Sequence, residues 1–235
     1  MDTAMAEYIV TLVASFLAVA VVLTLHEFAH ALVAYKCGDP TAKWNGRLTL
    51  NPMKHFDLFG LLAFTLVGFG WAKPVPINPY NFKKYRTGLF LTASAGIALN
   101  YLTAFLFYPL FLLVMMLFAH TGYIPFVTDI SLEFTYRLFA YSLSFAAFNL
   151  LPLFPLDGFR IVDAFNKRRG KIFRFLRDYG QWILLGLIFE SFICDAFVRM
   201  GVSQFAYFDI LGWIMEFAVN ILGWPITKLW GLLPW

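Results

Sequence analysis

The sequence predicts an all-α polytopic membrane protein with about five to six transmembrane helices and a re-entrant or interfacial β/loop segment after the first of them. The first observation is compositional: 60% of the 235 residues are hydrophobic and only 14% are charged, whereas a soluble domain has about 45–50% apolar and about 25% charged residues. The second is that the apolar residues gather in stretches of membrane-spanning length. A soluble globule and a disordered chain are therefore excluded.

Five apolar stretches are long enough to cross a bilayer. The first follows an acidic N-terminus and is too long for a signal-peptide core, so we expect it to be a retained span. In chain order, the five stretches cover residues 5–36, 87–119, 133–151, 179–200 and 205–232. No room is left for a separate soluble domain. We therefore expect a single integral membrane domain over residues 1–235, with a core at about 5–178 and additional C-terminal helices at 179–232.

The apolar stretch 58–71 is too short for an ordinary crossing and contains three glycines, which is typical of a re-entrant or interfacial piece. Before it, Thr41 to Leu50 includes the run RLTL and is predicted to form strands. An exposed edge there would pair with another extended segment of polypeptide. The alternative is a plain interfacial loop.

Basic residues indicate which side each loop faces. They flank stretch 58–71 on both sides and fill loop 152–178, whereas loop 120–132 contains no Lys or Arg. The positive-inside rule then predicts an N-terminus outside, a C-terminus in the cytoplasm, and a stretch 58–71 that returns to the side it entered from. The basic run 167–177 is expected to face anionic lipid of the inner leaflet rather than nucleic acid.

The first apolar stretch ends in LTLHEFAHALVAY. His26 and His30 are four residues apart, so on a helix they share one face and can bind one zinc ion, and Glu27 beside them can act as a general base. Ionisable groups inside a membrane helix are costly and usually functional, which disfavours a purely structural histidine pair.

A catalytic zinc needs a third protein ligand. The segment NLLPLFPLDGFR leaves the 133–151 helix on the same side of the membrane, and its prolines and glycine allow irregular backbone there. Asp157 is therefore the predicted third ligand. The expected side of the membrane, or the expected depth within it, matches less well for His55, His120 and Asp163. A membrane metalloprotease with a glutamate ligand would use Glu133, Glu190 or Glu216 instead. A transporter is a more distant alternative, since no inverted repeat is evident.

The two metal motifs, HEFAH and NLLPLFPLDG, resemble those of the site-2 protease family of intramembrane zinc metalloproteases, in its small prokaryotic type without PDZ or CBS domains. The segments NGRLTLNPMKHFDLFG, GFGWAKPVPINPYNFKKYR and SAGIALN are similar to connecting segments of that family. The resemblance implies one zinc ion per chain, held by His26, His30 and Asp157, with Glu27 as the catalytic acid/base. It further implies that Asn149 and Asn100 contact the substrate or stabilise the oxyanion. Ile97 replaces a proline of the family pattern.

The implied activity is hydrolysis of peptide bonds within or near transmembrane segments, as in regulated intramembrane proteolysis. The expected substrates are single-pass transmembrane proteins whose spans unwind readily, and the expected surroundings are a cell membrane with an anionic inner leaflet. We expect an active site nearer the cytoplasmic face and no nucleic-acid partner. A catalytically inactive relative that serves as a membrane binding scaffold is an alternative, and the oligomeric state is left open.

Overall fold

The computed structural model describes residues 3–67, 70 and 72–232, and within these ranges the regular structure is helical throughout. The predicted all-α membrane fold is thus confirmed. The α-helices are α1 (Thr3–Cys37), α2 (Thr41–Trp44), α3 (Leu58–Val67), α4 (Tyr85–Thr121), α5 (Val127–Asn149), α6 (Asp157–Phe165), α7 (Lys171–Arg199) and α8 (Ile210–Trp230). Three short 3-10 helices lie between them, η1 (Pro52–Lys54), η2 (Pro79–Asn81) and η3 (Ser203–Phe208).

Four of the described helices, α1, α4, α7 and α8, are long and apolar enough to cross a bilayer, which makes the chain a multi-pass membrane protein. Helix α5 corresponds to the predicted span 133–151. It is long enough at 23 residues but less apolar, because its first half carries Asp129, Glu133 and Arg137. Glu133 and Arg137 form an ion pair one turn apart. The total number of spans stays a prediction.

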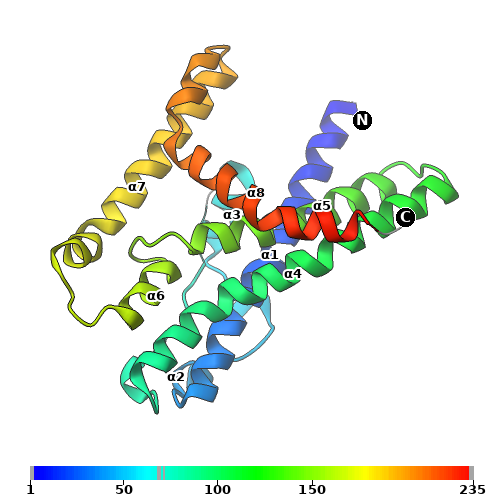
Figure 1. Cartoon of the computed structure of the whole chain (residues 1–235). Coiled ribbons are helices and arrows are strands. Elements are labelled where there is room, and N and C mark those ends of the chain that lie inside the picture. The colour runs from blue at the N-terminus through cyan, green and yellow to red at the C-terminus, as the bar shows by residue number, and fades with distance from the viewer. Residues whose placement is uncertain (1–2, 68–69, 71, 233–235) are drawn as a thin grey trace.

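Helices α1, α4 and α5 form the core of the molecule and cross near its centre (Figure 1). Alanines at 0% exposure, such as Ala14, Ala18 and Ala31, line the packed faces of α1. Small residues let helix backbones approach closely inside a membrane, where packing rather than water exclusion drives association. The buried cluster of Ala18, Val22 and Leu138 joins α1 to α5 in this way.

Helix α7 diverges from this core, and α8 returns across α4 and α5 (Figure 1). Ile226 of α8 is completely buried against Ala104 of α4 and Leu143 of α5. The Trp230 indole N–H donates to the Phe105 carbonyl at 3.0 Å. The end of α8 is therefore fixed to the core, whereas α7 is joined to it mainly through its neighbours.

The connection between α1 and α4 is irregular, and the strands predicted over Thr41–Leu50 are not formed. Asp39, which is fully buried, accepts hydrogen bonds from Thr41, Asn78 and Asn81. These bonds start the α2 turn, and Gly46 follows with a φ of +64°. A strand cannot pass through such a sequence of turns. In the described part of the connection, β-type pairing is limited to one isolated bridge between Phe56 and Ala72.

Stretch 58–71 contains the ten-residue helix α3, which is too short to span a bilayer as a straight helix. It packs against α1 through a cluster that includes Val19, Leu23 and Leu61. Gly68 of the predicted stretch lies outside the described residues. The re-entrant path therefore stays a prediction.

Candidate metal centre and active site

Helix α1 carries the HExxH motif in its last third. The 35 residues from Thr3 to Cys37 contain neither Gly nor Pro, so the helix runs without a break through the motif. His26, Glu27 and His30 are 5%, 9% and 4% exposed. Because side chains four residues apart on a helix share a face, both imidazoles point to the same side of α1.

Asp157 comes to the histidines from a distant part of the chain, as the first residue of α6. Its neighbour Gly158 explains how the chain can turn there: a Cβ at that position would lie 2.4 Å from the Leu150 carbonyl oxygen and 2.5 Å from that of Leu151. Only glycine permits this close approach. The Asp-Gly pair of the sequence motif thus places the carboxylate while it lets the loop fold back tightly.

The three predicted ligand atoms converge. Asp157 Oδ2 lies 2.9 Å from His30 Nε2 and 3.3 Å from His26 Nε2, and the two Nε2 atoms are 3.0 Å apart. Ligands at about 2.0–2.1 Å from a tetrahedral zinc ion are about 3.3–3.4 Å from one another. Asp157 Oδ2 is also buried without a hydrogen bond of acceptable geometry, although two ring nitrogens are close. This is expected when the lone pairs of three ligands point to one common position, so the donor set fits zinc.

One face of α4 lies directly against the two imidazoles. The Thr92 carbonyl oxygen is 2.7 Å from His30 Nδ1, and the Asn100 amide nitrogen is 3.1 Å from His26 Nδ1. Gly96 lies between them, and a Cβ there would be 2.5 Å from His26 Cε1 and from His30 Nε2. Thr92, Gly96 and Asn100 are four residues apart in turn; we call them the α4 stripe. Residues at this spacing share one face only where the helix is continuous, and α4 is continuous at Ile97.

Glu27 is held by an extended segment that precedes η2. The Val75 backbone N–H donates to Glu27 Oε2 at 2.9 Å. Val75 is the one residue of 74–76 that has an N–H, since Pro74 and Pro76 flank it. Arg47, 6% exposed, donates from its guanidinium to the Lys73 carbonyl and so fixes the same segment. Burial lowers the pKa of Arg47, and the negative charge of Glu27 opposes that shift.

Sequence reasoning did not identify Thr92, Gly96, Val75 or Arg47. The contacts of Thr92 and Val75 use backbone atoms, which leave no residue-type signal. The PVP pattern was the one available sign that Val75 supplies the single backbone N–H of this short segment.

The remaining predicted residues lie elsewhere or have other partners. Asn149, at the end of α5, donates from its amide to the Phe145 carbonyl at 3.1 Å, so it is engaged within its own helix. The alternative ligands are also bonded apart from the cluster: His55 to the Thr49 carbonyl, His120 to the Met116 carbonyl, Asp163 to Arg169, Glu133 to Arg137, and Glu190 to the Ile210 N–H. Within the described residues, the convergent set of metal-binding side chains is His26, His30 and Asp157.

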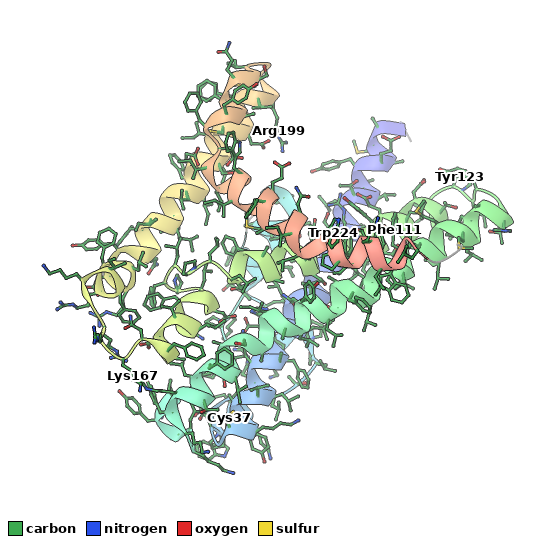
Figure 2. All side chains as sticks on the ribbon, viewed as in Figure 1. Cys37, Phe111, Tyr123, Lys167, Arg199 and Trp224 are labelled. Carbon is green, nitrogen blue, oxygen red and sulfur yellow. The ribbon has the colours of Figure 1, made fainter. Side chains whose placement is uncertain are left out.

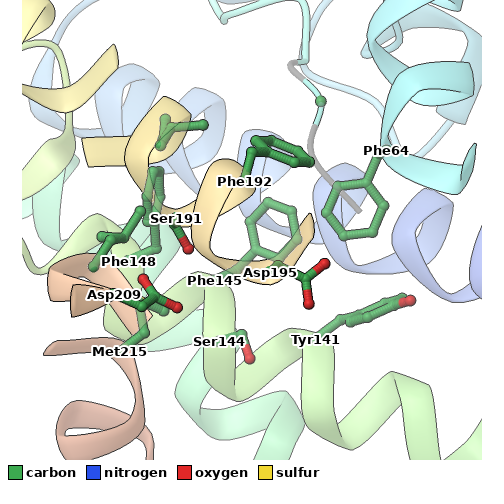
Figure 3. A pocket seen from close by; sticks show the side chains of 13 residues that line it. Phe64, Tyr141, Ser144, Phe145, Phe148, Ser191, Phe192, Asp195, Asp209 and Met215 are labelled. Atoms are coloured by element: carbon green, nitrogen blue, oxygen red, sulfur yellow. The ribbon is translucent and has the colours of Figure 1, made fainter. Parts of the chain in front are cut away.

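A cavity of about 500 Å³ opens between α3, α5, α7 and α8. Aromatic side chains such as Phe64, Tyr141 and Phe145 line it, together with the carboxylates of Asp195 and Asp209 (Figure 3). Asp209 is the residue that precedes α8. It also caps α8, because Oδ1 accepts the Gly212 N–H at 2.7 Å.

Comparison with known proteins places these residues in context. Residues 14–189 match the model of a family described as Peptidase family M50, and this range contains the HExxH motif, the α4 stripe and Asp157. A protein of Bacillus subtilis (strain 168), "Putative zinc metalloprotease YwhC", is 45% identical over 156 residues, which are 66% of this chain and 67% of that protein. No solved structure matches the chain.

Proposed function

The chain belongs to peptidase family M50, and we propose that it is a zinc-dependent intramembrane endopeptidase that hydrolyses peptide bonds within or near transmembrane segments of other membrane proteins. One observation carries the proposal: His26, His30 and Asp157 converge on one buried position, with Glu27 next to His26 in the sequence. Zinc bound by these three residues would supply Lewis acidity, which polarises a carbonyl group and lowers the pKa of water.

Glu27 is the proposed general base and acid. The Val75 N–H occupies Oε2, which leaves Oε1 to take the proton of the attacking water and to deliver it to the leaving amine. Asn149 is proposed as a donor to the developing oxyanion, a contact whose loss typically lowers the rate by about 10²–10³-fold. Its amide would then exchange the Phe145 carbonyl for the substrate.

The proposed substrates are single-pass membrane proteins, cleaved in the course of regulated intramembrane proteolysis. A helix engages its peptide groups in its own hydrogen bonds, so a span must unwind before a carbonyl can be attacked. Spans that contain Gly, Asn or Pro near the cleavage position meet this requirement most readily. Such substrates should become poorer when these residues are replaced by Leu or Ala.

We also propose that the N-terminus is outside the cell, that the C-terminus is cytoplasmic, and that the metal centre is nearer the cytoplasmic, anionic leaflet. Figure 2 supports one part of this proposal, a common side for the end of α1 and the basic loop: Cys37 and Lys167 both lie toward the lower end, away from Arg199 at the top. Protease-accessible tags at each terminus, compared in sealed right-side-out and inverted vesicles, test the orientation.

The test of the activity is cleavage of a model single-span substrate by protein reconstituted in vesicles. Glu27→Gln should bind zinc as the wild type does and lower the rate by at least about 10²–10⁴-fold, the usual contribution of a general base. Glu7→Gln, on the exposed start of the same helix, is the matched control and should cleave normally. A Glu27→Gln protein that cleaves at the wild-type rate refutes the assigned role. Zinc bound by a wild type that cleaves no membrane substrate would favour the scaffold alternative.

A further inference from the structure

Each histidine of the metal centre contacts the α4 stripe through Nδ1, the ring nitrogen that faces away from the metal position. The contacting group differs between the two histidines. His30 faces the carbonyl oxygen of Thr92. A carbonyl can only accept a hydrogen bond, so Nδ1 of His30 must carry a proton. The contact with Thr92 thus accounts for one ring nitrogen of His30 and directs the other, Nε2, to the metal position.

His26 faces a side-chain amide instead, and this contact is incomplete as it stands. The Asn100 Nδ2 atom lies 3.1 Å from His26 Nδ1, while the other amide atom, Oδ1, is buried without any hydrogen bond. An N–H donor toward Nδ1 requires the proton of His26 to be on Nε2, the atom that must bind the metal. Rotation of the Asn100 amide by 180° exchanges Oδ1 and Nδ2 and leaves the shape of the side chain unchanged. Oδ1 then accepts the Nδ1 proton, and Nε2 is left with its lone pair.

We propose that Asn100 is a positioning residue of the metal centre, whose Oδ1 accepts the Nδ1 proton of His26 and so fixes the imidazole in the orientation and tautomer that bind zinc. The proposal rests on the zinc-binding role of His26 and adds the residue that prepares it. Partners of this kind, on the far side of a ligating histidine, typically change metal affinity by about 10–100-fold when they are removed.

This role differs from the substrate contact that the family resemblance implies for Asn100. The side chain has 0% exposure and is enclosed between α1 and the core of α4. A substrate therefore has no access to this side chain in the structure described. The buried position is therefore suited to holding the imidazole.

The experiment compares three variants in detergent, with zinc affinity measured by competition against a chromophoric chelator. Asn100→Leu keeps the approximate size but has no polar atom, and we expect about 10–100-fold weaker zinc binding. Asn100→Asp keeps an acceptor at Oδ1 and should bind zinc within about threefold of the wild type, because carboxylates serve as such partners. Thr103→Val is the matched control: it removes a buried hydroxyl one turn away, which donates to the Asn100 backbone carbonyl and to Ser142 but contacts neither the Asn100 amide nor a histidine, and should leave the zinc affinity unchanged.

Cleavage at saturating zinc separates the two roles of Asn100. A positioning role predicts that KM of Asn100→Leu stays at the wild-type value, whereas a substrate contact predicts a raised KM with unchanged zinc affinity. The inference is overturned if Asn100→Leu binds zinc as tightly as the wild type, or if Asn100→Asp binds it as weakly as Asn100→Leu. If the wild type binds zinc but cleaves no substrate, the proposed function fails while the positioning role of Asn100 stands.

Discussion

Replacement of Gly96 by alanine is the most direct test of how closely α4 and α1 are fitted around the metal centre. The added Cβ would lie 2.5 Å from His26 Cε1 and from His30 Nε2, and 2.7 Å from His26 Nδ1. Non-bonded carbon atoms normally stay about 3.5–4.0 Å apart. The helices or the imidazoles must therefore move by about 1 Å.

Such a movement is large on the scale of metal coordination, in which distances are held within about ±0.2 Å. We expect Gly96→Ala to weaken zinc binding by more than about 100-fold and to lower cleavage in proportion. Thermal unfolding in detergent measures the loss of zinc binding separately from the loss of activity. At a zinc concentration of about 100 times Kd, the wild type should gain about 2.7 kcal/mol of stability, whereas Gly96→Ala should gain almost none.

Gly186→Ala in α7 is the matched control, because nothing lies within 4 Å of a Cβ built there. Both substitutions replace a helical glycine and so bring the same intrinsic helix preference, about 0.5–1 kcal/mol in favour of alanine. Gly186→Ala should keep the full zinc-dependent gain in stability. The reasoning would be refuted by a Gly96→Ala protein with the same zinc-dependent gain and cleavage rate as Gly186→Ala.

Three further predictions concern the surroundings of the site. Val75→Pro removes the N–H that binds Glu27 and should lower kcat about 10-fold or more at unchanged zinc content, measured by cleavage and metal analysis. Hydrogen bonds outweigh burial and hold the pKa of Asp39 below its usual value. Its contribution to stability is complete above about pH 4 and is lost as the pH falls further, so Asp39→Asn should flatten the acid side of the stability profile obtained by thermal unfolding. Ile226→Ala should destabilise the protein by about 2–5 kcal/mol through the cavity left between α8 and the core, as chemical denaturation in detergent would show.

The parts of the fold that were predictable depend on local patterns. Membrane helices follow from apolar length, and the shared face of His26 and His30 follows from helical periodicity. Asp157 was predictable because the proline-rich segment before it marks irregular backbone at membrane depth. The strands expected over Thr41–Leu50 were wrong, because the bonds of Asp39 and the turn at Gly46 outweighed the β preference of the run RLTL.

The α4 stripe could not be predicted, because it depends on how two helices far apart in the sequence are aligned. Thr92 acts through its backbone, and a glycine such as Gly96 is common in membrane helices for other reasons. Asn100 was singled out by its motif alone. Its contact with His26 requires knowledge of which face of α4 packs on α1, and this is set by the whole interface.

The positions of the candidate ligands along the chain also determine when the candidate metal centre can form. The histidines are synthesised early, on the first helix, but their partners Thr92 and Asn100 follow 62 and 74 residues later. Asp157 comes later still, after α5. A nascent chain that has inserted only α1 holds two histidines with neither a third ligand nor a fixed orientation. Assembly of this candidate site therefore requires the chain as far as α6, and a protein in which α1 does not pair with α4 would leave both histidines without Thr92 and Asn100.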